Sequence, residues 1–127
     1  MIRILIADPD SATRKALSSL LHRKLDSNTI VEVENIEALI RQLADIPPDL
    51  LVLDWRLNGS PAPEICKLLQ KAYPLLKIIL LSVDANDAAA AKQAGANFIH
   101  KGASPVELIA MLEPILKKTG NEAGTIK

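Results

Sequence analysis

Short aliphatic runs alternate with longer amphipathic stretches along the whole chain, and this alternation constrains the fold more than any other feature. Runs with the character of β-strands occur at Ile2–Ala7, Thr29–Glu34, Leu50–Leu53, Lys77–Leu81 and Phe98–His100. Most are almost continuously apolar, as strands covered on both faces are, whereas the second alternates like a half-exposed edge strand. Strand and helix alternating with short connections predict an α/β fold with a five-stranded parallel sheet and right-handed crossovers.

Apolar residues between these runs recur at helical spacing. The stripes are Ala12, Ala16, Leu17, Leu20 and Leu21; Ile36, Leu39, Ile40 and Leu43; Ile65, Leu68, Leu69 and Ala72; and Leu108, Ile109, Leu112, Ile115 and Leu116. Asp10, Asp84 and either Ser60 or Ala62 are suited to begin helices. Ser104 and Glu107 have the spacing of a capping box. Pro114 lacks a backbone N–H, so we expect the last helix to kink or restart there.

A length of 127 residues is typical of one domain, which we place at residues 1–118. Residues 119–127 are predicted to be a flexible tail or the start of a linker. Lys and Arg balance Asp and Glu at 15 each, and only 2% of residues are aromatic. We therefore expect neither a nucleic-acid surface nor binding to an anionic membrane.

Cys66 is the only cysteine, so the chain has no internal disulfide and no thiolate zinc cluster. Single-cysteine usage is compatible with a reducing cytosol. No apolar run approaches the roughly 18 residues that a membrane helix needs. These features predict a soluble, cytoplasmic protein.

Polar side chains follow the predicted core strands where each strand ends. Asp8 and Asp10 follow the first strand, Asp54 the third, Ser82 the fourth and Lys101 the fifth. The carboxyl ends of parallel strands lie at one edge of a sheet, where open α/β folds hold their sites. Each residue also has a simpler interpretation, since Asp8 or Asp10 could cap a helix, Ser82 could form a turn and Lys101 could be solvated.

Electrostatics narrow the chemistry of such an edge. Two carboxylates about 5 Å apart, at an effective dielectric constant near 20, repel by about 3 kcal/mol, so a proton or a cation must intervene. Oxygen ligands alone favour a hard ion such as Mg²⁺ over zinc. With a nucleophilic carboxylate, a hydroxyl and a lysine, this set suits a phosphoryl group.

The chain resembles the receiver domain of two-component response regulators from Ile2 to about Lys118. The motifs that carry the resemblance are Ile4-Leu5-Ile6-Ala7-Asp8, Asp49-Leu50-Leu51-Val52-Leu53-Asp54, Ile78-Ile79-Leu80-Leu81-Ser82, and Ala94-Gly95-Ala96 followed by Lys101. The resemblance implies a single-domain, doubly wound, flavodoxin-like fold with five helices and strand order 2-1-3-4-5. That order would place Asp8 and Asp54 on neighbouring strands.

The resemblance also implies site roles. Asp54 corresponds to the phosphoacceptor, which we expect to be exposed enough for modification. Asp8, Asp54 and the backbone carbonyl of Arg56 correspond to ligands of Mg²⁺ or Mn²⁺, with Asp10 as a candidate substitute for a missing acid. Lys101 would pair with the phosphoryl oxygens.

Two residues resemble the switch of the family. The Ser82 hydroxyl would close onto a phosphoryl oxygen, and Phe98 would be the rotating aromatic. An equally open interpretation makes Phe98 a core aromatic of the fifth strand.

The implied partners are a sensor histidine kinase or phosphotransfer protein and an effector domain or downstream protein. The effector would dock on the face of the fourth helix, fifth strand and last helix, and a second copy of the chain could pair through the last helix. The chain would act as a phosphoacceptor and not as a classical enzyme.

Several positions depart from the family pattern and keep two alternatives open. Pro9 stands where the family usually has a second acid, Asn58-Gly59 replaces the usual proline, and Gly102 follows Lys101 in place of proline. A degenerate receiver that binds partners without phosphorylation is therefore one alternative. The other is a small haloacid-dehalogenase-like phosphatase with Asp8 as nucleophile and Asp10 as acid, although Ala12 stands where that family expects Thr or Val.

Overall fold

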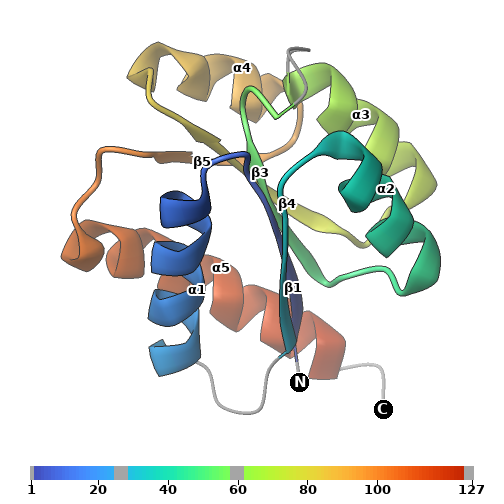
Figure 1. Cartoon of the computed structure of the whole chain (residues 1–127), viewed down its shortest axis with the longest axis horizontal. Coiled ribbons are helices and arrows are strands. Elements are labelled where there is room, and N and C mark those ends of the chain that lie inside the picture. The colour runs from blue at the N-terminus through green and yellow to red at the C-terminus, as the bar shows by residue number, and fades with distance from the viewer. Residues whose placement is uncertain (1, 25–28, 58–61, 125–127) are drawn as a thin grey trace.

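The chain folds into a parallel five-stranded sheet with the predicted strand order, β2-β1-β3-β4-β5. The computed structural model describes the backbone of residues 2–24, 29–57 and 62–124 and the side chains up to residue 117. The strands are β1 (Arg3–Ala7), β2 (Thr29–Val33), β3 (Leu50–Asp54), β4 (Lys77–Ser82) and β5 (Asn97–His100). The parallel α/β sheet predicted from the alternating pattern and the doubly wound arrangement implied by the family resemblance are both confirmed (Figure 1).

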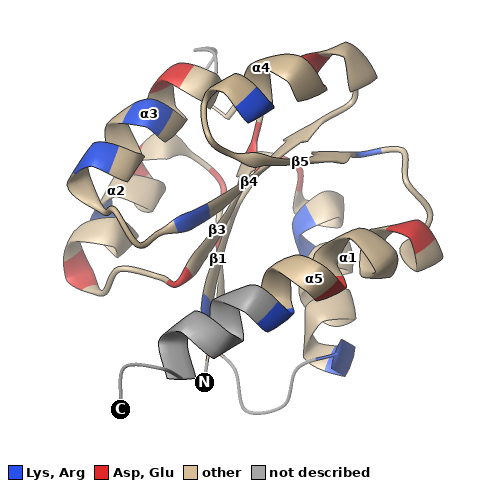
Figure 2. Cartoon of the chain, turned by 180° about the vertical axis from the view of Figure 1, so that it is seen from behind, with Lys and Arg blue, Asp and Glu red and all other residues tan. Residues whose placement is uncertain are grey.

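Helices cover both faces of the sheet (Figures 1 and 2). They are α1 (Ser11–Lys24), α2 (Ile36–Asp45), α3 (Ala62–Ala72), the 3-10 turn η1 (Ala85–Asp87), α4 (Ala88–Gln93) and α5 (Pro105–Gly124). One face packs against α1 and α5, and the other packs against α2, α3 and α4. No helix within residues 2–24, 29–57 and 62–124 is long and apolar enough to cross a membrane.

Strand periodicity divides the aliphatic core into these two layers. Leu51 and Leu53 on β3 face the layer of α2, α3 and α4, whereas Leu50 and Val52 face α1 and α5. All five residues of β3 are buried, as expected for a central strand with both faces covered. Edge strand β2 is only half-buried over four of its five residues. Cys66 is buried in the layer of α2, α3 and α4.

Side chains cap several helices where the sequence predicts. Asp10 accepts a hydrogen bond from the Thr13 backbone N–H at the start of α1, and Ser104 and Glu107 form the expected reciprocal capping box. Asn35 also caps α2 by accepting from the Ala38 N–H at 2.8 Å, which sequence analysis missed. The Ser60 alternative for the start of α3 lies outside the described residues.

Of the two outcomes predicted at Pro114, a kink or a restart of the last helix, the restart does not occur. Helix α5 is continuous through this residue and does not restart there. Leu112 and Leu116, on either side of the proline, are buried in the layer shared with α1, and this packing holds the helix where one hydrogen bond is missing. The helical backbone also continues to Gly124, six residues beyond the predicted domain end at residue 118.

Strand order defines where a site should form. Strand β1 lies between β2 and β3, so the connections leaving β1 and β3 run to opposite sides of the sheet. A crevice opens at the carboxyl ends of such strands. Asp8 follows β1 and Asp54 ends β3 at this point.

Candidate functional site

The structure brings Asp8, Asp54 and Lys101 together at the carboxyl edge of the sheet. The Lys101 Nζ atom lies 2.9 Å from Asp8 Oδ2 and 2.5 Å from Asp54 Oδ1. One ammonium thus bridges two carboxylates from neighbouring strands. This placement removes the repulsion that two adjacent carboxylates would otherwise suffer.

Backbone and side-chain contacts fix Asp8 from several directions. Its N–H donates to the Val33 carbonyl at 3.1 Å, and its Oδ1 accepts the Asp10 N–H at 2.8 Å. Arg14 Nη1 donates to the Asp8 carbonyl at 2.7 Å, and the same guanidinium contacts Glu32 on β2. The Asp8 side chain is fully buried, and its Oδ2 contacts the Lys101 ammonium without a hydrogen bond of good geometry. This oxygen therefore retains accepting capacity inside the crevice.

Asp54 is less exposed than the sequence led us to expect. The residue is only 5% exposed. The Lys101 ammonium covers its Oδ1, and the Arg56 backbone N–H donates to its Oδ2 at 2.9 Å. Access to this carboxylate therefore requires Lys101 to shift. Lys101 is itself partly exposed, and its long side chain has the rotational freedom to do so.

Lys101 is placed by the sheet as well as by its ion pairs. Its backbone N–H donates to the Ser82 carbonyl at 2.8 Å, which extends the pairing of β4 with β5 by one residue. Burial lowers the pKa of the ammonium, but the contacts with the negatively charged Asp54 and Asp8 carboxylates outweigh burial and raise that pKa above its ordinary value of 10.5. The side chain is therefore fully charged at neutral pH.

The raised pKa of Lys101 predicts how stability depends on pH. The folded state holds this proton more tightly than the unfolded state, so the stabilisation is complete below pH about 10 and is lost as pH rises through the folded pKa. Urea unfolding of wild type and Lys101→Met at pH 8 and near pH 11.5 tests this. We expect the difference in unfolding free energy to shrink at the higher pH; an unchanged difference would contradict the assignment.

Ser82 lies at the same edge, but its hydroxyl donates to Asp87 and not to Asp8 or Asp54. Its Oγ donates to Asp87 Oδ2 at 2.6 Å and accepts the Asp84 N–H at 3.0 Å. The side chain is 4% exposed. Sequence analysis placed Ser82 correctly at the strand end and assigned no role to Asp87. A carboxylate five residues after a serine, across a short turn, was the only available signal.

The predicted switch aromatic, Phe98, is half-buried on β5 and packs against the layer of α2, α3 and α4. Its ring lies 6.5 Å from the ring of Trp55, edge to face at 82°. Trp55 directly follows Asp54, and its N–H donates to the Leu81 carbonyl. The single tryptophan therefore lies between the candidate acceptor and the candidate switch residue, well placed to report on both.

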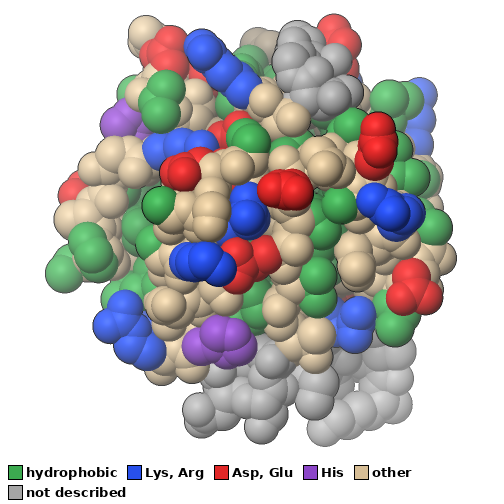
Figure 3. Space-filling model, in the orientation of Figure 1, with side chains coloured by type: hydrophobic (Ala, Val, Ile, Leu, Met, Phe, Trp, Pro, Cys, Tyr) green, Lys and Arg blue, Asp and Glu red, His purple; other side chains and the backbone are tan. Residues whose placement is uncertain are grey.

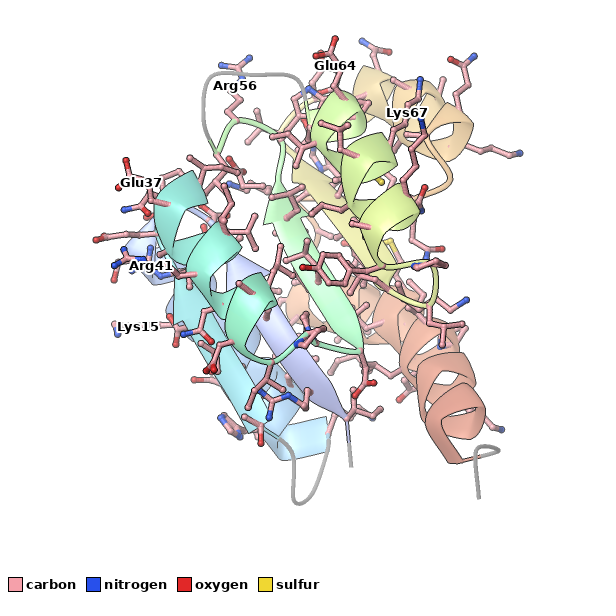
Figure 4. The ribbon with its side chains drawn as sticks, turned by 90° about the vertical axis from the view of Figure 1, so that its right-hand side faces the viewer. Lys15, Glu37, Arg41, Arg56, Glu64 and Lys67 are labelled. Atoms are coloured by element: carbon pink, nitrogen blue, oxygen red, sulfur yellow. The ribbon has the colours of Figure 1, made fainter. Side chains whose placement is uncertain are left out.

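Asp10 and Arg56 are exposed, unlike the buried carboxylate pair of Asp8 and Asp54. The Asp10 carboxylate is exposed and accepts from the Thr13 hydroxyl at 2.6 Å as well as from the Ala12 and Thr13 N–H groups. These hydrogen bonds, the Thr13 hydroxyl first, lower the pKa of Asp10. The Arg56 side chain points outward from the loop after β3 (Figure 4). Asn58 and Gly59, which follow in this loop, lie outside the described residues.

His100 links the loop that follows Ser82 to the loop that carries Lys101, a role that sequence analysis missed. Its Nδ1 accepts the Gly102 N–H at 3.2 Å, which leaves Nε2–H to donate to the Val83 carbonyl at 2.8 Å. A Cβ atom on Gly102 would lie 2.7 Å from His100 Cε1. Glycine at this position therefore allows the imidazole to approach the backbone of its own loop.

The donor set partly fits a hard divalent cation. Asp8 and Asp54 supply carboxylate oxygens, and Asp8 Oδ2 has unused accepting capacity. No cluster of three or more His, Cys, Asp or Glu side chains suited to a metal occurs among the described residues. Any such ion would therefore need backbone or water oxygens besides these two carboxylates. Figure 3 shows acidic and basic side chains interspersed on the face of the molecule that it draws.

Comparison with known proteins places this chain in a defined class. The response regulator receiver domain family model matches residues 4–113. The chain belongs to this family and is a receiver domain of the two-component type.

Individual relatives agree with this assignment. The sensory transduction protein LytT of Bacillus subtilis is 44% identical over 71 residues, which are 56% of this chain and 30% of LytT. The phosphate regulon regulator PhoB of Pseudomonas aeruginosa is 27% identical over 122 residues, covering 92% of this chain and 52% of PhoB. The chain thus matches about half or less of the length of these relatives.

Solved structures share the fold. A CheY-like receiver domain from Methanospirillum hungatei superposes with a TM-score of 0.79 at 20% identity, covering 96% of this chain and 98% of that one. The BeF3-activated receiver domain of DrrB, from Thermotoga maritima, gives a TM-score of 0.78 at 23% identity, with coverage of 92% and 98%.

Proposed function

We propose that Asp54 accepts a phosphoryl group from the phosphohistidine of a sensor histidine kinase or phosphotransfer protein, and that this modification switches a partner-binding surface. The observation that supports this most directly is the contact of one ammonium, from Lys101, with the carboxylates of Asp54 and Asp8. A cation beside a nucleophilic carboxylate suits transfer of an anionic group. Membership of the receiver family supports the same function.

The transfer is a displacement at phosphorus. An Asp54 carboxylate oxygen attacks the phosphorus, the P–N bond to the donor imidazole breaks, and its electron pair leaves with the imidazole nitrogen. The product is an acyl phosphate on Asp54. Lys101 would exchange its contact with Asp54 Oδ1 for the phosphoryl oxygens and so keep the added charge paired.

Receiver domains generally bind Mg²⁺. In this chain Asp8, Asp54 and the Arg56 carbonyl would hold the ion, or Mn²⁺ in its place, and it would neutralise charge on the phosphoryl oxygens. Asp10 would join only by giving up the hydrogen bonds that cap α1. Because Pro9 provides no side-chain oxygen, we expect a weaker metal site than one with three carboxylates.

The modification would reach partners through Ser82 and Phe98. Ser82 would turn toward the phosphoryl group, and Phe98, beside Trp55, would move inward. The surface thus changed comprises α4, β5 and α5, which we propose as the docking face for an effector domain or downstream protein. A second copy of the chain is a further candidate partner of α5.

The test is phosphorylation by acetyl phosphate in the presence of Mg²⁺, followed by intact mass spectrometry. We expect wild type to gain one phosphoryl group and Asp54→Asn to gain none, because the amide is not a nucleophile for this transfer. Asp49→Asn is a matched control, since Asp49 also adjoins β3 but bonds to Arg3 at the opposite end of the strand. A phosphoryl group retained in Asp54→Asn would contradict the proposal.

The same assay separates the alternatives. A haloacid-dehalogenase-like phosphatase would hydrolyse phosphate esters in Asp54→Asn but not in Asp8→Ala. A degenerate receiver would give no phosphoryl gain in wild type. The degenerate alternative has one specific observation in its favour, the engagement of Asp10 in the α1 cap beside Pro9.

A further inference from the structure

Ser82 is held by a carboxylate that belongs to neither the proposed phosphoryl site nor a helix cap. Its Oγ donates to Asp87 Oδ2 at 2.6 Å, a short hydrogen bond to a charged acceptor. Asp87 precedes α4 at the N-cap position, yet its side chain makes no capping hydrogen bond. The Asp87 carboxylate is therefore directed at Ser82 and not at the backbone of α4.

A serine hydroxyl has one proton to donate. In the structure that proton goes to Asp87, while the Asp84 N–H occupies an acceptor position of the same oxygen. A hydrogen bond from Ser82 to a phosphoryl oxygen on Asp54 would need the same proton. The two acceptors therefore compete, and Ser82 satisfies only one of them at a time.

We propose that Asp87 is a positioning residue that holds Ser82 away from Asp54 and so sets how readily the phosphorylated conformation forms. This inference rests on the proposed function of Asp54. The Ser82–Asp87 hydrogen bond is lost when Ser82 turns to the phosphoryl group. Its free energy therefore offsets part of the stabilisation that the new hydrogen bond gives to the phosphorylated conformation. Release of Asp87 also frees a carboxylate at the start of α4, which couples Ser82 to the proposed docking face.

Beryllofluoride with Mg²⁺, a mimic of the phosphoryl group, tests this through the fluorescence of Trp55. We expect Asp87→Ala to bind it about 10-fold more tightly than wild type, because a hydrogen bond to a charged group is worth about one such factor. Asp87→Asn keeps a neutral acceptor and should fall between the two. It also covers the case in which Asp87→Ala folds poorly.

A double-mutant cycle isolates the contribution of the Ser82 hydroxyl to the change in affinity. In a Ser82→Ala background no proton is contested, so adding Asp87→Ala should leave the affinity unchanged. Asp84→Ala removes an equal charge from the same turn but leaves the Ser82–Asp87 hydrogen bond in place, and we expect it to tighten binding by less than twofold.

Three outcomes would overturn the inference: equal affinities in Asp87→Ala and wild type, the same gain with and without Ser82, or an equal gain from Asp84→Ala. Failure of the proposed function of Asp54 would give a different result from these three. In that case wild type shows no response to beryllofluoride that Asp54→Asn removes, whatever residue stands at position 87.

Discussion

Lys101→Met is expected to lower the unfolding free energy by about 3 kcal/mol at neutral pH, because it removes the ammonium that two buried carboxylates share. Asp8 is fully buried and Asp54 nearly so, which leaves little water to replace the lost contact. The partial exposure of Lys101 places the effect at the lower end of the range for a broken buried ion pair. Urea unfolding, followed by circular dichroism, measures the change.

A control separates this effect from the loss of any surface lysine. Lys67 is an exposed residue of α3 (Figure 4), and Lys67→Met should change the unfolding free energy by less than about 0.5 kcal/mol. If Mg²⁺ binds at the carboxylates, it should stabilise Lys101→Met more than wild type, because no ammonium competes with it. Equal stability of the two methionine variants would show that the bridge contributes nothing.

The second large effect is expected in the core. Leu80 is completely buried at the centre of β4, and Leu80→Ala should cost about 3–4 kcal/mol from lost burial and the cavity that remains. An aliphatic core with 2% aromatic residues in the chain offers few large side chains to fill that space. Denaturant midpoints of wild type and the variant test this prediction.

Leu75 provides the matched comparison because the same side chain is 80% exposed there. Leu75→Ala should alter the unfolding free energy by less than about 0.5 kcal/mol. A loss in Leu80→Ala no greater than that in Leu75→Ala would contradict the prediction, because the lost burial at Leu80 should cost more even if the layer around β4 rearranges to fill the cavity.

Most of the fold was predictable because strand periodicity and strand ends are local properties of the sequence. The run from Leu50 to Leu53 indicates a strand covered on both faces, and parallel pairing then sets Asp54 beside Asp8. The strand order itself came from the family resemblance. Residue periodicity alone identifies strands but does not order them.

Side-chain orientation at the site was harder to predict because it depends on competition between hydrogen-bond partners. Ser82 lies at the expected edge but bonds to Asp87, and Asp10 serves α1 instead of turning to Asp8. The low exposure of Asp54 arises from Lys101, 47 positions along the chain from it. No local pattern indicates which of several nearby acceptors a hydroxyl or an ammonium will choose.

The backbone hydrogen bond from Lys101 to the Ser82 carbonyl has a consequence for speed. This bond continues the ladder of β4 and β5, so under the proposed function both side chains would exchange partners without a change in this backbone pairing. Rotations of exposed side chains take place in picoseconds to nanoseconds, whereas local unfolding takes microseconds to seconds. The rate at which this domain responds would then be set by phosphoryl transfer to Asp54 and not by the rotation of these side chains.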